Sequence, residues 1–255
     1  MKKSKIAVLV AMVVVLAFSL AACGGSDKSS SDKTVYKVGT EPTFPPFDTT
    51  DEDQNIVGLD MDLIKAIGED QGFDVEFENL SFDGLIPALK AGNIDIVAAG
   101  MNKDDEDRQK EVDFSDSYYE SKLFVAVTED NTTIKSVEDL TPDMKVAAQT
   151  GTTGASKVQE LKDAGKIKEA VILDGLDTCM MKLINGDVSA VINDKPVTEA
   201  YMKKKPDKIK MVGEALNAEN YGFAVQKGNT ELVEKINKGL KNIKENGTYD
   251  KLVDE

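Results

Sequence analysis

The sequence predicts an α/β protein with two lobes, each a mainly parallel sheet flanked by helices. Two observations carry this prediction. Short apolar runs of strand length alternate with amphipathic runs of helical period, which is the pattern of βαβ units. The alternation occurs twice along 255 residues, a length that suffices for two lobes with a core each.

The first alternation begins near residue 35. Its strands and helices are predicted in turn at residues 36–39, 60–71, 74–79, 83–91 and 94–99. Leu63, Ile64 and Ile67 recur at helical spacing, whereas Val75 and Phe77 alternate as strand residues do. A parallel sheet covered on both faces follows from this order.

The second alternation supplies the other lobe. Its strands and helices are predicted in turn at residues 145–149, 153–164, 169–173, 177–184, 189–192 and 197–204. A further helix over residues 230–245 places Leu232, Ile236 and Leu240 on one face, and Gly247 suits its carboxyl-terminal cap.

The amino-terminal segment predicts export and lipid attachment. Three lysines lie in the first five residues, an apolar run covers residues 6–18, and Leu20-Ala21-Ala22 precedes Cys23. This order is typical of a lipoprotein signal peptide, residues 1–22, cleaved before a lipidated Cys23. The alternative is a plain signal peptide or a membrane anchor, although the apolar run is short for a bilayer span. Residues 23–34, rich in Gly and Ser, predict a flexible tether.

Composition excludes several functions. Removing the three signal-peptide lysines lowers the formal charge from −15 to −18, which argues against nucleic acid as a partner. The chain has no histidine, which removes His-based triads and His-containing zinc sites. No nucleotide fingerprint is present, and we expect no cofactor and no metal. Cys179 is left as the single unmodified cysteine and is predicted to be a buried apolar residue.

Three local patterns are candidates for a binding site. The Gly/Thr-rich turn at residues 149–154 follows a strand and opens a helix, so its N–H groups suit a carboxylate. Arg108 offers a planar fork that binds carboxylates. Asp194 lies at the carboxyl end of a strand, where open α/β sheets bind ligands. The respective alternatives are a threonine-capped turn, a surface arginine within the acidic run 104–107, and a helix N-cap.

One acidic loop resembles a calcium site without completing it. Asp51, Asp53 and Asn55 have the spacing of the first three ligands, but Ile56 stands where glycine is needed and Asp62 where glutamate is needed. We therefore predict a polar hairpin turn.

Together these segments resemble bacterial extracellular solute-binding proteins of family 3, the amino-acid receptors of ABC importers, from about residue 35 to 252. The resemblance is carried, in the family's order, by residues 39–47, 57–63, 82–89, 108 with 112–115, 151–153, 193–194 and 245–249. It implies that Arg108 and the N–H groups at Thr153 bind the α-carboxylate of an amino acid. Gly100 and Asp194 are then expected at the α-ammonium.

The resemblance also implies residues around the ligand's side chain. Phe44 and Phe82 correspond to flanking aromatics, and Glu41 and Gln149 to residues at its far end. Their polarity favours a polar or cationic ligand over an aliphatic one, because a buried carboxylate or amide needs a partner. Asn102 stands where the family usually has Thr or Ser, so the contacts of this loop are expected to differ.

The family's architecture implies a type II periplasmic-binding-protein fold. Lobe 1 would comprise residues 35–121 and 218–255, and lobe 2 residues 122–217, with hinge strands near 121–127 and 221–225. The expected function is capture of an L-amino acid between the lobes and delivery to a membrane permease. The protein would be a monomer, lipid-anchored on the extracytoplasmic face of the cell membrane, and no enzyme.

Two other classes remain as alternatives. An exported enzyme similar to cyclohexadienyl dehydratases shares the fold, and Glu41 would then act as a base. The lipid tether and the lack of histidine argue against it. A sensor ectodomain would need another membrane span or a signalling domain, and the given sequence ends at Glu255 without one.

Overall fold

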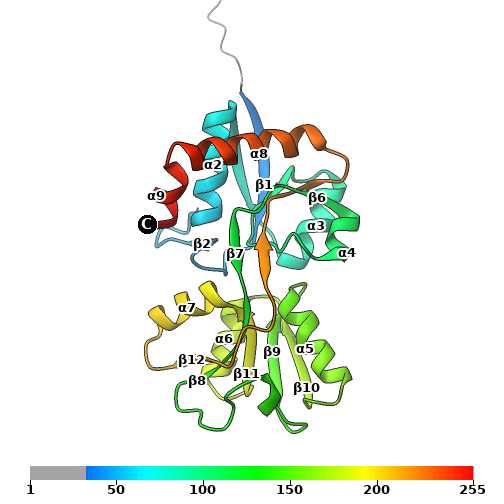
Figure 1. Cartoon of the computed structure of the whole chain (residues 1–255), viewed down its shortest axis with the longest axis vertical. Helices are drawn as coiled ribbons and strands as arrows, with labels where there is room; N and C mark the ends of the chain where they lie inside the picture. The colour runs from blue at the N-terminus through cyan, green and yellow to red at the C-terminus, as the bar shows by residue number, and fades with distance from the viewer. Residues whose placement is uncertain (1–32, 255) are drawn as a thin grey trace, which may run out of the picture. The chain divides into compact units, whose positions relative to one another are not determined.

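Two five-stranded sheets organise the protein in the computed structural model, which describes residues 33–254 (Figure 1). The predicted signal peptide, Cys23 and most of the predicted tether lie outside these residues. The strand orders are β4-β1-β5-β14-β6 and β10-β9-β11-β8-β12. In each sheet the first two pairings are parallel and the last two antiparallel. The two-lobed α/β prediction is confirmed, with mixed sheets whose parallel part is the predicted βαβ core.

The first sheet and its helices combine the two ends of the described chain. Their bounds are β1 (Thr34–Thr40), α2 (Leu59–Gln71), β4 (Phe73–Asn79), α3 (Phe82–Ala91), β5 (Ile96–Val97), α4 (Glu106–Glu111), β6 (Val112–Phe114), β14 (Ala224–Gln226), α8 (Thr230–Glu245) and α9 (Thr248–Asp254). β1 begins at Thr34, the last residue of the predicted tether. The buried Leu63, Ile64 and Ile67 of α2 join the core of this lobe, as their spacing predicted.

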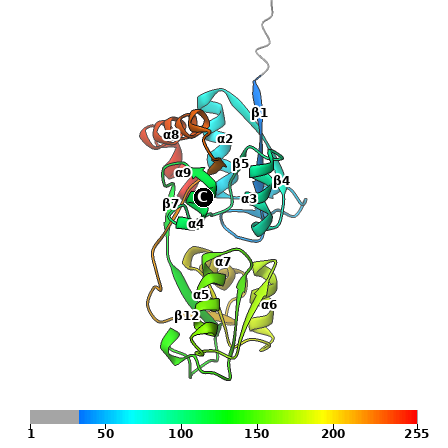
Figure 2. The same ribbon diagram turned by 90° about the vertical axis from the view of Figure 1, so that its right-hand side faces the viewer.

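Helix α8 packs beside α2, although the two are far apart in sequence (Figure 2). Gly239 permits the close approach, because a Cβ there would lie 2.8 Å from Ile67 Cγ2. The buried stripe of α8 contains the predicted Ile236 and Leu240. Gly247 follows its end with a φ of 78°, the left-handed conformation that suits glycine. The carboxyl-terminal segment therefore completes the first lobe.

The second sheet is built from one continuous stretch of chain. The bounds are β8 (Leu123–Thr128), η1 (Val137–Asp139), β9 (Lys145–Gln149), α5 (Thr153–Asp163), β10 (Glu169–Leu173), α6 (Leu176–Ile184), β11 (Ala190–Asp194), α7 (Lys195–Lys204) and β12 (Ile209–Val212). All five residues of β11 are buried, which fits a central strand covered on both faces. Cys179 of α6 is fully buried, as predicted, and burial raises the pKa of its thiol to about 12.

A two-stranded ribbon connects the two sheets along the chain. β7 (Tyr119–Ser121) pairs with β13 (Glu219–Tyr221), antiparallel. The predicted hinge strands near 121–127 and 221–225 are therefore each divided in two. The ladder changes partner after Ser121 and Tyr221, because β8 pairs in the second sheet and β14 in the first.

The acidic loop at residues 51–55 is a turn between the short strands β2 (Thr49–Thr50) and β3 (Ile56–Val57). The Asp51 carboxylate accepts bonds from the N–H groups of Asp53 and Asn55, at 2.9 and 2.8 Å. Its oxygens thus close a hairpin turn, as predicted.

Candidate ligand-binding site

All nine sequence-predicted ligand residues line one cavity. They are Glu41, Phe44, Phe82, Gly100, Asn102, Arg108, Gln149, Thr153 and Asp194. Ala99, Thr152 and Glu219 also line it and were not predicted. Because the lining comes from β9, β11 and α5 as well as from the first lobe, both lobes and the β7–β13 ribbon contribute to the site.

Arg108, the single arginine of the chain, is buried at one side of the cavity. Asp105 caps α4 and fixes its start by accepting the Arg108 N–H at 2.9 Å. The guanidinium donates to the carbonyl of Asn102 at 3.2 Å and to that of Gly151 at 2.8 Å. Burial lowers its pKa, which the charges of Asp105 and Glu219 partly offset. Arginine stays charged nonetheless, and three of its five donors remain for an anion.

The turn before α5 lies beside this guanidinium. Thr152 is the N-cap of α5, because its hydroxyl oxygen accepts the Ala155 N–H at 3.0 Å. Gly151 adopts a φ of 76° close to Asp83 of α3. The helix therefore begins at Thr153 with its first N–H groups lacking intrahelical partners, at an end where the dipole favours negative charge. The capping alternative is thus correct for Thr152 and compatible with an anion site at Thr153.

Asp194 contributes a buried acidic group to the same cavity. It occupies the N-cap position of α7, but its side chain makes no capping bond. Its Oδ1 accepts instead from the Ser121 hydroxyl at 2.9 Å and the Tyr221 hydroxyl at 2.5 Å. Burial, followed by the charge of Glu219, raises the pKa of Asp194 to about 8.

Glu219 was missed by the sequence reasoning. It is buried, its Oε1 accepts from Asn217 at 3.0 Å, and it stands opposite Ser121, whose hydroxyl donates to Asp194. A signal was present in the sequence. Tyr221 was placed in a hinge strand, and the residue two positions earlier in a strand shares its face.

Hydrogen bonds with residues that do not line the cavity hold the loop after β5 in place. Gly100 has a φ of 52° and donates its N–H to Asp60 Oδ2 at 2.7 Å, while a Cβ there would lie 2.6 Å from Phe44 Cε1. Asn102 Oδ1 accepts the N–H groups of Asp104 and Asn220, at 3.1 and 3.2 Å. The Asn102 oxygen therefore ties the loop to β13.

Glu41 and Gln149 contact each other across the two lobes. Glu41 Oε2 accepts from Gln149 Nε2 and from the Thr43 hydroxyl, each at 2.8 Å. Gln149 Nε2 also donates to the Asp174 carbonyl at 3.0 Å. Burial raises the pKa of Glu41, and the bonds from Gln149 and Thr43 partly oppose this. Glu41 therefore contributes an acidic group to this wall of the cavity.

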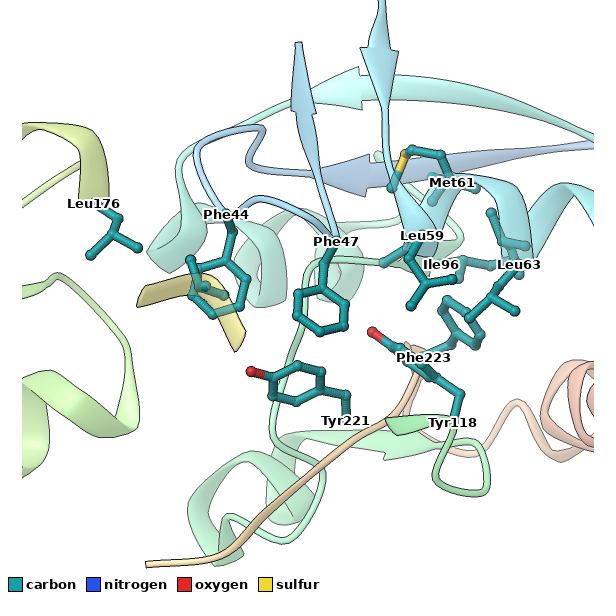
Figure 3. Packing of buried hydrophobic residues seen from close by; sticks show 14 of the residues in the cluster. Phe44, Phe47, Leu59, Met61, Leu63, Ile96, Tyr118, Leu176, Tyr221 and Phe223 are labelled. Atoms are coloured by element: carbon teal, nitrogen blue, oxygen red, sulfur yellow. The ribbon is translucent and has the colours of Figure 1, made fainter. Parts of the chain in front are cut away.

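The two predicted aromatics differ in their surroundings. Phe44 is buried and its ring centroid lies 6.1 Å from that of Phe47 and 6.3 Å from that of Tyr221, so it belongs to the core as well as to the cavity (Figure 3). Phe82 is partly exposed at the start of α3, and the Arg108 guanidinium lies 5.4 Å from its ring centroid. Phe82 therefore supports the position of Arg108.

Residues 33–254 contain no cluster of three or more His, Cys, Asp or Glu arranged to hold a metal ion. Over the same residues no helix combines the length and the apolar character that a membrane crossing requires.

A cavity lined from two α/β lobes, with a buried cation and buried carboxyl groups in its lining, defines a two-lobed solute-binding protein. The comparisons give the family. Residues 36–255 match the model of bacterial extracellular solute-binding proteins, family 3, and the chain belongs to that family.

Individual relatives agree with this assignment. The chain is 34% identical to a probable histidine-binding protein of Neisseria gonorrhoeae, over 92% of this chain and 90% of the relative. An ancestral arginine-binding protein bound to arginine has a TM-score of 0.83 at 44% identity, covering 87% of this chain and 97% of that one. An ancestral amino acid-binding protein that is a precursor of cyclohexadienyl dehydratase has a TM-score of 0.79 at 37% identity, covering 86% and 94%.

Proposed function

We propose that this protein captures an L-amino acid in the cavity and delivers it to the membrane permease of an ABC importer. The observation that carries the proposal is the placement of Arg108 and Asp194 in one buried cavity. The α-carboxylate would bind Arg108 and the N–H groups at Thr153, and the α-ammonium would bind Asp194 and the Gly100 carbonyl. A zwitterion then meets the opposite charge at each end, where little water screens the interaction.

The ligand's side chain is assigned to the wall formed by Phe44, Phe82, Glu41 and Gln149. Glu41 is an acid, and its Oε2 acts as a hydrogen-bond acceptor for Gln149 and Thr43. Because a buried acceptor is matched by a donor or a positive charge, a donor-rich or cationic side chain fits this end best. Arginine, lysine and glutamine are therefore the favoured ligands, ahead of leucine and phenylalanine.

Capture and delivery use the two lobes as a clamp. We assign lobe 1 to residues 35–121 and 218–255 and lobe 2 to residues 122–217, with the β7–β13 ribbon as the hinge. A ligand that touches both lobes stabilises the form in which they are closed, and the permease would recognise that form. Lipidation of Cys23 would hold a monomer on the extracytoplasmic face of the membrane.

A thermal-shift screen of the twenty amino acids tests the proposal, after unfolding and refolding have removed any co-purified ligand. We expect the melting temperature to rise with the concentration of a polar or cationic amino acid. No shift at millimolar concentration would refute the amino-acid receptor. Shifts with aliphatic or aromatic ligands alone would refute only the roles of Glu41 and Gln149.

A second candidate is a dehydratase-like enzyme. It is favoured by one observation, the raised pKa of Glu41 in the cavity, since a carboxylate with a raised pKa is a better base. Mass spectrometry of the ligand recovered from denatured protein separates the two candidates. A ligand recovered unchanged after long incubation supports the receptor, and a dehydrated product supports the enzyme.

A further inference from the structure

Two acids line the ligand cavity, where an α-ammonium needs only one counter-charge. Asp194 comes from the end of β11, and Glu219 from β13. Both are buried, with exposed fractions of 6% and 2%. Two carboxylates that share a buried site do not both ionise readily, because each disfavours the charge of the other.

The hydrogen bonds show how such a pair is held. Asp194 Oδ1 accepts hydrogen bonds from the Ser121 and Tyr221 hydroxyls, and Glu219 Oε1 accepts one from the Asn217 amide. These donors come from the ribbon and from the segment beside it. Ser121 stands opposite Glu219 in the ribbon, so the hydroxyl that bonds Asp194 comes from the cross-strand partner of Glu219. The two carboxyl groups therefore line the same part of the cavity, close enough for each to disfavour the charge of the other.

Among the described residues, the charged and titratable groups that interact with this pair include Arg108 from α4, with Asp105 beside it, and Tyr221 of β13. Lys195 follows Asp194 in the chain but pairs with Glu199 at 3.6 Å, where both side chains are partly exposed. A ligand ammonium is therefore the charge that the pair lacks.

We propose that Glu219 is a ligand-site residue which shares one proton with Asp194, and that the α-ammonium of the captured amino acid displaces this proton to solvent. The inference rests on the proposed function. The protonated pair and a zwitterionic ligand come together, the ammonium takes the place of the shared proton between the two carboxylates, and the buffer accepts the proton. Capture is thereby coupled to the release of a proton.

The burial that raises the pKa of Asp194 to about 8 supports this coupling, since the free pair then keeps its proton at pH 6 and at pH 7. The sign follows. Below pH 8 the free protein holds a proton that the complex lacks, so affinity rises with pH. For one proton the dissociation constant falls close to tenfold per pH unit.

Isothermal titration calorimetry with L-arginine tests the coupling between pH 6 and 7, where the ligand keeps its own amino proton. Titrations in phosphate and in imidazole, which both buffer in this range, differ in buffer ionisation enthalpy, and the slope gives the protons released. We expect most of one proton for the wild type and close to none for Glu219→Gln. We also expect Glu219→Gln to bind at pH 6 at least as tightly as the wild type, whereas a purely structural role would weaken binding at every pH.

The matched control is Glu120→Gln, an exposed residue opposite Asn220 in the same ribbon, which should release protons as the wild type does. Tight binding by the wild type without proton release, and with an affinity independent of pH, would refute the coupling and leave the proposed function standing. Release that persists in Glu219→Gln would assign the proton to another group, such as Glu41, and would also refute it. Should Glu219→Gln fail to fold, Glu41→Gln decides, because proton release that persists in Glu41→Gln supports the pair and release that is lost there refutes it. Absence of binding by any amino acid would instead refute the proposed function.

Discussion

Replacing Arg108 by alanine should abolish most of the ligand affinity. The guanidinium keeps three donors beyond its bonds to Asn102 and Gly151, and a carboxylate takes two of them as a fork. A hydrogen bond to a charged group contributes about 1.5–3 kcal/mol, so the pair of bonds amounts to about 3–6 kcal/mol. Micromolar binding corresponds to about 8 kcal/mol in total. Roughly 10²-fold to 10⁴-fold weaker binding is therefore expected.

Calorimetry with the best amino acid from the thermal-shift screen measures this loss. Lys110→Ala is the matched control, because Lys110 lies on the same helix with its side chain exposed. It should bind as the wild type does. Arg108→Lys should fall between the two, since lysine keeps the charge without the planar fork. Wild-type affinity in Arg108→Ala, with an unchanged circular dichroism spectrum, would remove Arg108 from the site.

Three further predictions concern anchoring, packing and pH. Cys23→Ala should release the protein from membranes in its host, and retention after salt and carbonate washes would contradict lipidation. Phe82→Ala should weaken ligand binding while the free protein melts within a few degrees of the wild type, whereas Phe44→Ala, which removes a buried core ring, should cost the free protein up to about 3–5 kcal/mol by urea unfolding. The pKa values of Asp60 and Asp194 are raised to about 6 and about 8, so each group stabilises the fold fully only below about pH 4. Each contribution is lost by about 1.4 kcal/mol per pH unit until the pH reaches the folded pKa, so the free energy of unfolding should fall between about pH 5 and 8. A stability that is constant or rises over this range in urea titrations would contradict this.

Local patterns predicted what local forces determine. The bounds of β9, β10 and α8 agree with the sequence prediction to the residue, because their apolar periods are regular and their ends carry turn residues. The division of the hinge strands was not predicted. It depends on which distant strand pairs with each residue, as where Tyr221 pairs with Tyr119 and Ala224 with Val97.

The candidate site was likewise predicted in part from the sequence. Arg108, Asp194 and the turn at residues 149–154 were candidates from local patterns, and the family resemblance added the other residues. The structure brings all nine into one cavity, while their roles stay predictions. Glu219 and the bond from the Gly100 N–H to Asp60 were not foreseen. Both depend on contacts between segments far apart in the chain, and the alternation with Tyr221 is the one local sign that the acidic Glu219 is buried.

The cavity also shows why binding and stability are opposed in this fold. Arg108, Glu41, Asp194 and Glu219 are removed from water together, and three acids against one cation leave an excess of negative charge whenever the acids are ionised. Folding alone does not supply the missing positive charge. Protonation supplies part of it, as the raised pKa values of Asp194 and Glu41 indicate, and an amino acid with a cationic side chain supplies more than a neutral one. In the proposed receptor, the same imbalance would lower the stability of the free protein as pH rises and would favour a cationic ligand.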